Sequence, residues 1–114
     1  MNRSYSLKRH KEFRFTYRVG KHTGGRLFAL VFAKNRLRKL QVGLSASKKL
    51  GGSVQRNRAK RRIRACLHPL LPNIRTGYNL VVVLREGVLT EPFPSLMREM
   101  ENQLKRAGLW VEKP

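Results

Sequence analysis

The residues with the clearest chemistry lie in one basic segment, residues 48–64, with the sequence KKLGGSVQRNRAKRRIR. Almost half of its positions are Lys or Arg, and none is acidic. Arg presents a planar fork of donors that suits phosphate and also stacks on nucleobases. Asn57 adds an uncharged hydrogen-bonding group near the start of a predicted helix, where phosphate binds well. The segment therefore predicts a surface that binds a phosphate-rich polymer.

An ordinary solvated helix face with internal ion pairs would also be rich in Lys and Arg. That interpretation fails here, because no acidic residue lies between Glu12 and Glu86 to pair at i,i+4. The whole chain has 26 Lys and Arg against 6 acidic residues, all of them Glu, for a net charge of +20. Charge of this size opposes a compact fold through self-repulsion unless a polyanion neutralises it. RNA, DNA and a membrane surface are the polyanions to consider.

Catalytic side chains are much less evident in the sequence. A metal-dependent nuclease commonly needs clustered carboxylates that converge on Mg²⁺, whereas this chain has scattered Glu and no Asp. The histidines, His10, His22 and His68, have no recognisable catalytic neighbours. Cys66, the single cysteine, falls on a predicted core stripe and is expected to serve packing. We therefore expect no catalytic and no metal-binding residue in the chain.

Length and composition predict one cytoplasmic domain, residues 1–114. A chain of this length is typical of a single domain, and a hydrophobic fraction of 40% supports a folded core. A single cysteine allows no internal disulfide, which suits a reducing compartment. No apolar run is long enough to span a membrane, and the first ten residues lack the apolar core of a secretion signal.

A helix must position the basic segment, and we expect it to begin with Ser53 as its N-cap and to run to about Leu67. Its apolar residues fall on one stripe that faces the core, and its cations occupy the rest of the surface. That stripe consists of Ala59, Ile63, Cys66, Leu67 and Leu70.

A second helix is predicted over residues 7–19 and ended by Gly20. His10, Phe13 and Tyr17 share one stripe of this helix, while Phe15 lies on a different face. Aromatic residues on two faces indicate either a helix in the middle of a core or one that offers a stripe to a ligand.

The remaining predicted elements are three strands and a closing amphipathic helix. Apolar or alternating runs predict the strands at residues 27–33, 41–47 and 78–84. Residues 95–107 have apolar positions at helical spacing and precede Gly108, which predicts the helix. The order predicts an α+β fold with a mixed sheet.

Several of these segments together resemble the protein subunit of bacterial ribonuclease P. The most specific match is GLSASKK at residues 43–49, followed by RNRAKRRIR at residues 56–64. Further matches, which extend the resemblance over nearly the whole chain, are Leu7-Lys8-Arg9, Phe13, Tyr17, Gly20 and YNLVVV at residues 78–83. The chain departs from the family pattern at Thr16, where the family usually has an apolar residue, and at Val31, where it often has an aromatic one.

The resemblance implies a single-domain α-β-β-β-α-β-α sandwich with a mixed four-stranded sheet and a left-handed βαβ crossover, as in a domain of one small-subunit ribosomal protein. It implies a part in ribonuclease P, the ribonucleoprotein that removes the 5′ leader of precursor tRNA by endonucleolytic cleavage. In that complex hydrolysis belongs to the RNA subunit and its Mg²⁺, so the protein is not catalytic alone. The expected partners are this RNA and precursor tRNA, with no protein-bound cofactor, no required protein partner and no membrane.

The resemblance also implies two RNA-binding surfaces. The first contacts the catalytic RNA and comprises Lys48, Lys49, Arg56, Asn57, Arg58, Lys60, Arg61, Arg62 and Arg64. The second is a cleft between the first helix and the sheet that receives the single-stranded leader, and it comprises Lys8, Arg9, Phe13, Arg14 and Tyr17. Aromatic stacking with backbone cations is the usual way in which proteins hold a single strand without strong sequence preference.

Three other interpretations fit the charge. A small basic ribosomal protein would share the basic helix but would need no aromatic groove. An autonomous nuclease would cleave precursor without RNA. A membrane-surface binder would need bulky apolar residues free to insert, whereas the apolar stripe of residues 59–67 is needed for the core.

Overall fold

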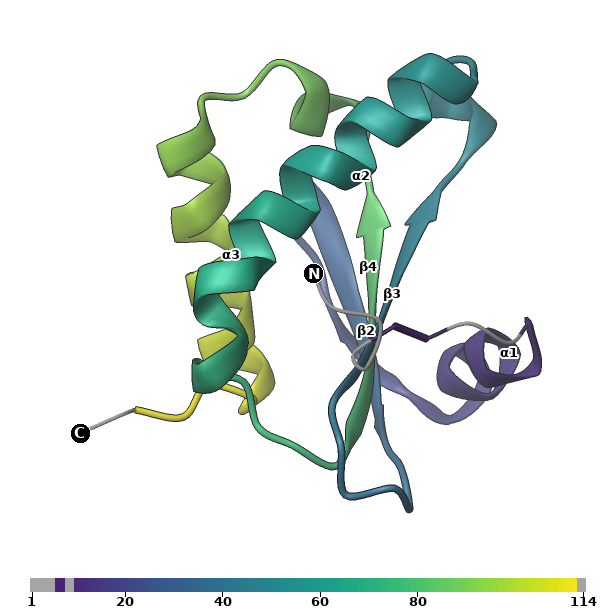
Figure 1. The fold of residues 1–114 in the computed structure, drawn as a ribbon, viewed down its shortest axis with the longest axis vertical. Helices are drawn as coiled ribbons and strands as arrows, with labels where there is room; N and C mark the ends of the chain where they lie inside the picture. Colours follow the sequence, from purple (N-terminus) through teal and green to yellow (C-terminus); the bar gives the residue numbers. More distant parts are fainter. Residues whose placement is uncertain (1–5, 8–9, 113–114) are drawn as a thin grey trace.

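A four-stranded mixed sheet with helices on both faces organises the chain in the computed structural model, which describes residues 6–7 and 10–112 (Figure 1). The strand order is β1-β2-β4-β3. The principal elements are α1 (His10–Val19), β1 (Lys21–Thr23), β2 (Phe28–Lys34), β3 (Gln41–Ala46), α2 (Ser53–Leu67), β4 (Tyr78–Leu84) and α3 (Phe93–Ala107). Short 3-10 turns lie between them: η2 (Lys48–Leu50), η3 (His68–Asn73) and η4 (Glu86–Leu89). The predicted α-β-β-β-α-β-α order is confirmed.

The crossover between the two parallel strands carries the basic helix. β3 pairs with β4 in parallel, whereas β4 with β2 and β2 with β1 are antiparallel. Figure 1 shows β3 and β4 both running upward, α2 in front of the sheet, and β4 to the left of β3. The crossover is therefore left-handed, which is rare among βαβ units.

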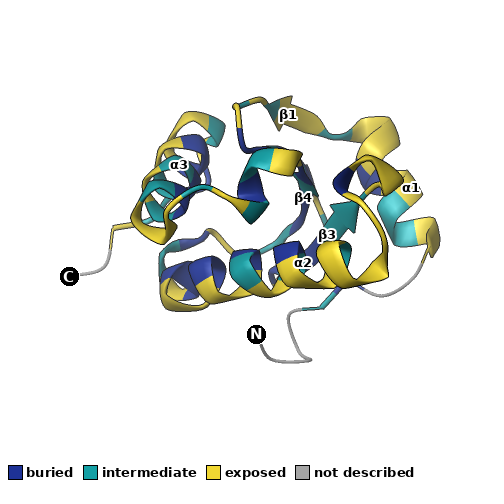
Figure 2. Cartoon of the chain, turned by 90° about the horizontal axis from the view of Figure 1, so that it is seen from above, coloured by how far each residue is buried: buried dark blue, intermediate teal, exposed yellow. Residues whose placement is uncertain are grey.

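Strand alternation divides the sheet into two different faces. On β3, Val42 is buried and Leu44 packs against the main core, as the alternation predicted. Gly43 and Ser45 face the opposite side, where α1 lies. The main core fills the space between the sheet, α2 and α3 (Figure 2). The small side chains of the second face leave room for α1 to approach closely.

The apolar stripe of α2 is buried as predicted. Ala59, Ile63, Cys66 and Leu67 are each 0% exposed, and Leu70 is buried in the turn that follows. The helix begins at Ser53, but its N-cap is Gly52, one residue before the predicted cap, and no side chain caps it. His68 is the C-cap. The helix therefore has an apolar anchor on one side and unneutralised backbone N–H groups at its start.

Two other predicted boundaries were wrong. α1 begins at His10 rather than at Leu7, whose backbone N–H donates to the carbonyl of Val42 at 2.8 Å and extends the edge of β3. α3 begins at Phe93, two residues before the predicted start, because Pro94 is tolerated in the first turn of a helix. Gly108 ends α3 with φ of 76°, a left-handed conformation that glycine adopts without steric cost.

Glu99 connects α3 to the start of β2. Its Oε2 accepts hydrogen bonds from the backbone N–H of Leu27 at 3.0 Å and of Phe28 at 3.3 Å, and from Nε2 of Gln103 at 3.1 Å. Gln103 is 0% exposed and donates to the carbonyl of Phe28. This carboxylate therefore satisfies main-chain donors that β1 does not reach.

We expect Glu99→Ala to lower the free energy of unfolding by about 2–3 kcal/mol, because several partly buried donors lose their acceptor. Urea denaturation followed by circular dichroism measures the change. The matched control is Glu101→Ala, since Glu101 forms only an exposed pair with Lys105 and its loss should cost much less. Equal effects of the two substitutions would contradict a structural role specific to Glu99.

Candidate nucleic-acid interface

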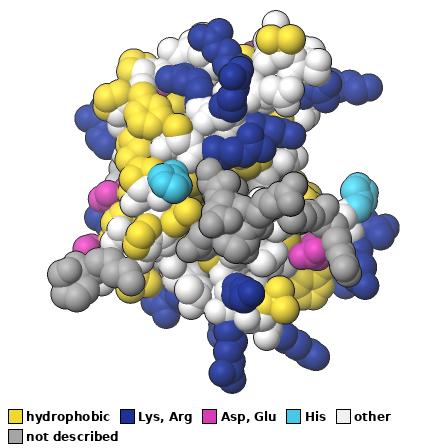
Figure 3. All heavy atoms as spheres, viewed as in Figure 1, with side chains coloured by type: hydrophobic (Ala, Val, Ile, Leu, Met, Phe, Trp, Pro, Cys, Tyr) yellow, Lys and Arg dark blue, Asp and Glu magenta, His cyan; other side chains and the backbone are white. Residues whose placement is uncertain are grey.

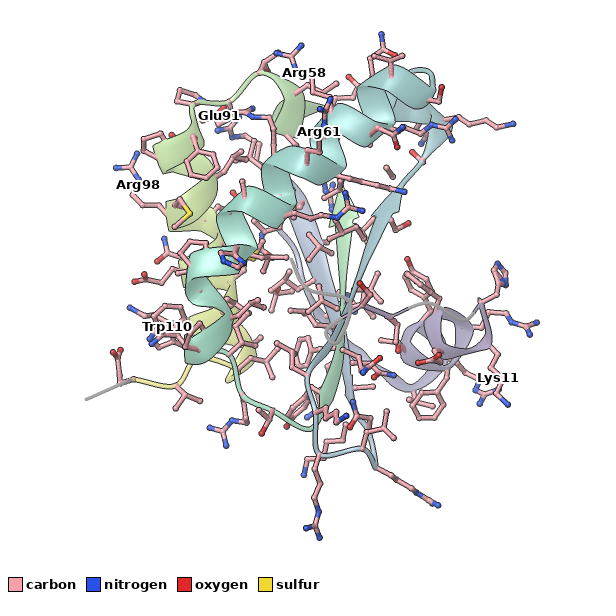
Figure 4. The ribbon with its side chains drawn as sticks, in the orientation of Figure 1. Lys11, Arg58, Arg61, Glu91, Arg98 and Trp110 are labelled. Carbon is pink, nitrogen blue, oxygen red and sulfur yellow. The ribbon has the colours of Figure 1, made fainter. Side chains whose placement is uncertain are left out.

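The outward side of α2 forms a continuous cationic surface. Arg58, Arg61 and Arg64 are exposed, and Lys60 is half-buried at its margin. Figure 4 shows Arg58 and Arg61 extending from α2 away from the sheet, and Figure 3 shows Lys and Arg side chains gathered over the upper part of the same face. Lys48 and Lys49, both exposed in η2, and exposed Asn57 extend the surface toward the start of the helix.

No acidic side chain neutralises this surface within residues 6–7 and 10–112. The ion pairs found there join Arg26 to Glu91 and Lys105 to Glu101, and neither involves α2. The first turn of α2 contains no acidic residue, and its N-cap contributes no side-chain hydrogen bond. The positive end of the helix dipole and the cations therefore add to one electropositive region.

Arg62 differs from the other predicted RNA-binding residues of α2. Its Nη1 donates to the carbonyl of Val88, and its Nη2 donates to the carbonyl of Glu91 at 2.7 Å. Both acceptors lie in the chain that connects β4 to α3. Most of this guanidinium is thus committed to the fold, and the sequence pattern gave no means to distinguish it from its neighbours.

Arg56 lies at the edge between the core and the cationic surface. The residue is half-buried, and its Nε is buried without a hydrogen-bond partner among the residues that the structure describes. Buried polar atoms in proteins almost always have a partner. The side chain stands within the first turns of α2, where the helix N-terminus and neighbouring cations favour an anion.

On the other face of the sheet, α1 rests on small side chains and one polar contact. The ring of Phe13 lies so close to Gly43 that a Cβ there would stand 2.5 Å from its Cζ. Thr16 is 0% exposed: its Oγ1 donates to the carbonyl of Glu12 and accepts from Nδ2 of Asn79 at 3.2 Å. Thr16 therefore fills the usual apolar position because Asn79 supplies a partner for its hydroxyl.

The predicted leader cleft would lie beside Phe13, between α1 and the sheet. Phe13 lies over Gly43, which is the register partner of Val81 on β4. Thr16 bonds to Asn79, two residues before Val81 on the same strand. On the other side of Val81, the cross-strand row of Ala29, Val83 and Ser45 is half-buried. Tyr17 follows Phe13 by one turn and is 45% exposed. Phe13 and Tyr17 thus lie one helical turn apart on α1, and the sheet beside Phe13 carries small or half-buried side chains.

The remaining residues predicted for the cleft are placed differently. Lys8 and Arg9 lie outside the described residues. Arg14 lines a separate hollow of about 640 Å³ on α1, to which neither Phe13 nor Tyr17 contributes. That hollow is lined by Lys11, Glu12, Arg14, Phe15, Arg18 and Asn79. The sequence prediction did not include Lys11, Phe15 or Arg18, although Phe15 on a second face of the helix was a signal.

Acidic, histidine and cysteine side chains are scattered through the described part of the chain. No group of three or more His, Cys, Asp or Glu side chains that could hold a metal ion occurs in residues 6–7 and 10–112. Burial raises the pKa of the Cys66 thiol to about 12, so the thiol stays protonated and serves packing, as predicted. In the same part of the chain, no helix has the length and apolar character needed to cross a membrane.

Comparison with known proteins finds one family. The family model described as Ribonuclease P matches residues 1–108. The "Ribonuclease P protein component" of Symbiobacterium thermophilum is 38% identical over 110 residues, which cover 96% of each chain. The protein of the same name from Chloroflexus aurantiacus is 36% identical over 96% of this chain and 82% of its own. The structure of the Staphylococcus aureus RNase P protein superposes with a TM-score of 0.83 at 27% identity, covering 93% of this chain and 97% of that one.

Proposed function

The chain belongs to the family of bacterial ribonuclease P protein components, and from this premise we propose that it binds the catalytic RNA of ribonuclease P through α2. The observation that carries the proposal is the acid-free surface of α2, which is exposed, anchored on the core and next to an uncapped helix start. Arg and Lys side chains on a rigid helix suit the phosphates of a folded RNA. Six of the predicted α2 and η2 cations are exposed or at the margin without a role in the fold: Lys48, Lys49, Arg58, Lys60, Arg61 and Arg64.

Arg56 has a related but more specific place in the proposal. Its buried Nε has no partner among the described residues, so a phosphate oxygen or base acceptor of the RNA would complete its hydrogen bonding. Arg62 would contribute mainly by holding α2 against the segment before α3. Arg62 could still contact RNA through the guanidinium N–H groups that do not donate to the carbonyls of Val88 and Glu91.

The cleft beside α1 is the proposed site of the precursor tRNA leader. Phe13 and Tyr17 offer aromatic faces on which successive bases stack, and the small side chains of the floor let a strand approach. The predicted cations Lys8 and Arg9 would pair with the leader backbone. Arg14 would contact RNA from the neighbouring hollow rather than from the cleft itself.

Removal of the leader by endonucleolytic cleavage would be the activity of the ribonucleoprotein, with hydrolysis performed by the RNA subunit and its Mg²⁺. The protein would bind no cofactor and need no second protein. We place the protein in the cytoplasm, since a single free cysteine suits a reducing compartment. The protein's contribution would be affinity for the RNA subunit and for the substrate.

The test is cleavage of a precursor tRNA by a bacterial ribonuclease P RNA at low Mg²⁺, with and without the protein. We expect no cleavage by the protein alone, weak cleavage by the RNA alone, and a clear increase in the rate when both are present. The increase should be lost when Arg56 and Arg58 are both replaced by Ala. Cleavage by the purified protein without RNA, or no effect of the protein on the RNA, would reject the proposal.

A further inference from the structure

A hollow between α2 and the first turn of α3 combines an exposed aromatic ring with guanidinium groups. It measures about 400 Å³ and is lined by Arg58, Arg61, Arg62, Ala65 and Phe93. Phe93 is the first residue of α3 and is 38% exposed. None of the lining residues is acidic, and neither Arg58 nor Arg61 forms an ion pair with any acidic side chain in the described part of the chain.

Two sides of this hollow, Arg62 and the backbone of Phe93, are held by the fold. Arg62 donates to the carbonyls of Val88 and Glu91 and so ties α2 to the segment that leads into α3. Pro92 and Pro94 flank Phe93 and restrict the backbone that carries its ring. Figure 4 shows Arg58 and Arg61 on α2 beside the segment that carries Glu91. A preorganised aromatic wall loses little conformational entropy when a ligand binds.

We propose that this hollow takes one unpaired base of the ribonuclease P RNA, stacked on the ring of Phe93, with the adjoining phosphates on Arg58 and Arg61. The proposal rests on the proposed function of α2 and adds a base-stacking subsite to its phosphate contacts. An aromatic face next to guanidinium groups is the arrangement that recognises splayed-out bases in single-stranded RNA. An apolar segment of a protein partner would leave the two guanidinium groups without anions.

Among the other exposed large apolar residues, Phe15 also lines a hollow with cations, but that hollow contains the acidic side chain of Glu12. Leu37 is 58% exposed and lies in the turn after β2, next to Arg36, Arg38 and Lys39. It lines neither the hollow at Phe15 nor the hollow at Phe93. Single exposed apolar residues of this kind are normal in proteins. Leu37→Ala therefore serves as a matched control for the loss of an exposed apolar side chain among cations.

The experiment measures binding of Phe93 variants to a bacterial ribonuclease P RNA transcript by filter retention at fixed salt. Phe93→Leu keeps an apolar side chain but removes the π face, and Phe93→Tyr keeps both. We expect Phe93→Leu to weaken binding roughly 5- to 100-fold, the range for loss of one stacked base, while Phe93→Tyr and Leu37→Ala bind within about twofold of the unchanged protein. The thermal midpoint of each variant checks that the fold is intact.

A second measurement separates stacking from charge. The dependence of binding on salt should be unchanged in Phe93→Leu, since no cation is removed, and should become shallower in Arg61→Gln by about one phosphate contact. Phe93→Leu binding as tightly as the unchanged protein, while the Arg56→Ala and Arg58→Ala double variant binds weakly, would overturn this subsite but not the role of α2. If neither set weakens binding, the proposed function fails as well.

Discussion

Raising the salt concentration from about 50 to 200 mM is expected to weaken binding of this protein to ribonuclease P RNA by roughly 10³- to 10⁵-fold. The range follows if six to ten phosphates are contacted, because each contact releases a condensed counterion. The cations of α2 and η2 suffice for such a number, since no acidic side chain pairs with them among the described residues. Titration of labelled RNA at several salt concentrations gives the slope.

Substitution at α2 should reduce both the affinity and that slope. In the double variant with Arg56→Ala and Arg58→Ala, the slope of log affinity against log salt concentration should become shallower by the equivalent of about two phosphate contacts. The matched control is Arg36→Ala with Arg75→Ala, which removes the same charge from exposed positions outside α2. Because the net charge of the two variants is equal, a difference between them reports position and not overall charge. Equal losses would contradict a specific role for α2.

Arg62→Gln offers a contrast on the same helix. This substitution removes the hydrogen bonds to the carbonyls of Val88 and Glu91 and should lower the thermal midpoint. It should change the salt slope less than Arg58→Gln, because most of the Arg62 guanidinium already has acceptors in the protein. A larger change in slope for Arg62→Gln would mean that its carbonyl contacts give way to phosphate in the complex.

Replacing Phe13 by Ala is expected to weaken binding of leader-bearing precursor tRNA to the assembled ribonucleoprotein roughly 5- to 100-fold. Binding of mature tRNA, which has no leader, should change little. Phe13 lies over Gly43, beside the proposed leader cleft. Its loss would remove a stacking face, while Thr16 and Asn79 still hold α1 on the sheet. Equilibrium binding of both RNAs to the same holoenzyme preparation measures the ratio.

The matched control for Phe13→Ala is Phe15→Ala, an aromatic substitution on the same helix. Phe15 is 38% exposed and lines the separate hollow with Lys11 and Arg18. We expect its loss to affect precursor and mature tRNA about equally. If Phe13→Ala also weakens both RNAs equally, the ring serves the packing of α1 and not the leader.

Gly43→Ala tests the position of the Phe13 ring without removing it. A Cβ at residue 43 would stand 2.5 Å from Cζ and 2.7 Å from Cε1 of Phe13, so the ring must move. We expect reduced preference for leader-bearing precursor with Phe13 still present. If the ratio of precursor to mature tRNA binding stays unchanged, leader binding does not depend on the position of the Phe13 ring.

The sequence by itself determined the charged surface and every helix and strand except β1, for which no pattern at residues 21–23 predicted a strand. Alternation at residues 41–47 and an apolar, β-branched run at residues 78–84 predicted strands, which formed at residues 41–46 and 78–84. The stripe from Ala59 to Leu67 has helical spacing, so it was buried and left the cations outside. Such patterns are local: the covalent geometry of helix and strand fixes which side chains share a face.

Helix boundaries depended on interactions that this periodicity does not encode. Leu7 fits a helical pattern, but its N–H pairs with Val42 at the edge of the sheet. Thr16 departs from the family pattern, and only Asn79, brought to it from residue 79 by the fold, explains why a hydroxyl is buried there. The cost of burying a polar group depends on a partner that is distant in sequence.

The tertiary structure alone decided which cations of α2 make hydrogen bonds within the fold and which stay exposed. Arg58, Arg61 and Arg62 are equivalent in the sequence, yet only Arg62 meets the carbonyls of Val88 and Glu91. The hollow at Phe93 and the contact of Phe13 with Gly43 likewise join segments far apart in the chain. Net charge depends only on residue types, and periodicity only on their order along the chain. A site depends on the distances between side chains, and those distances are set only when the sheet and helices pack together.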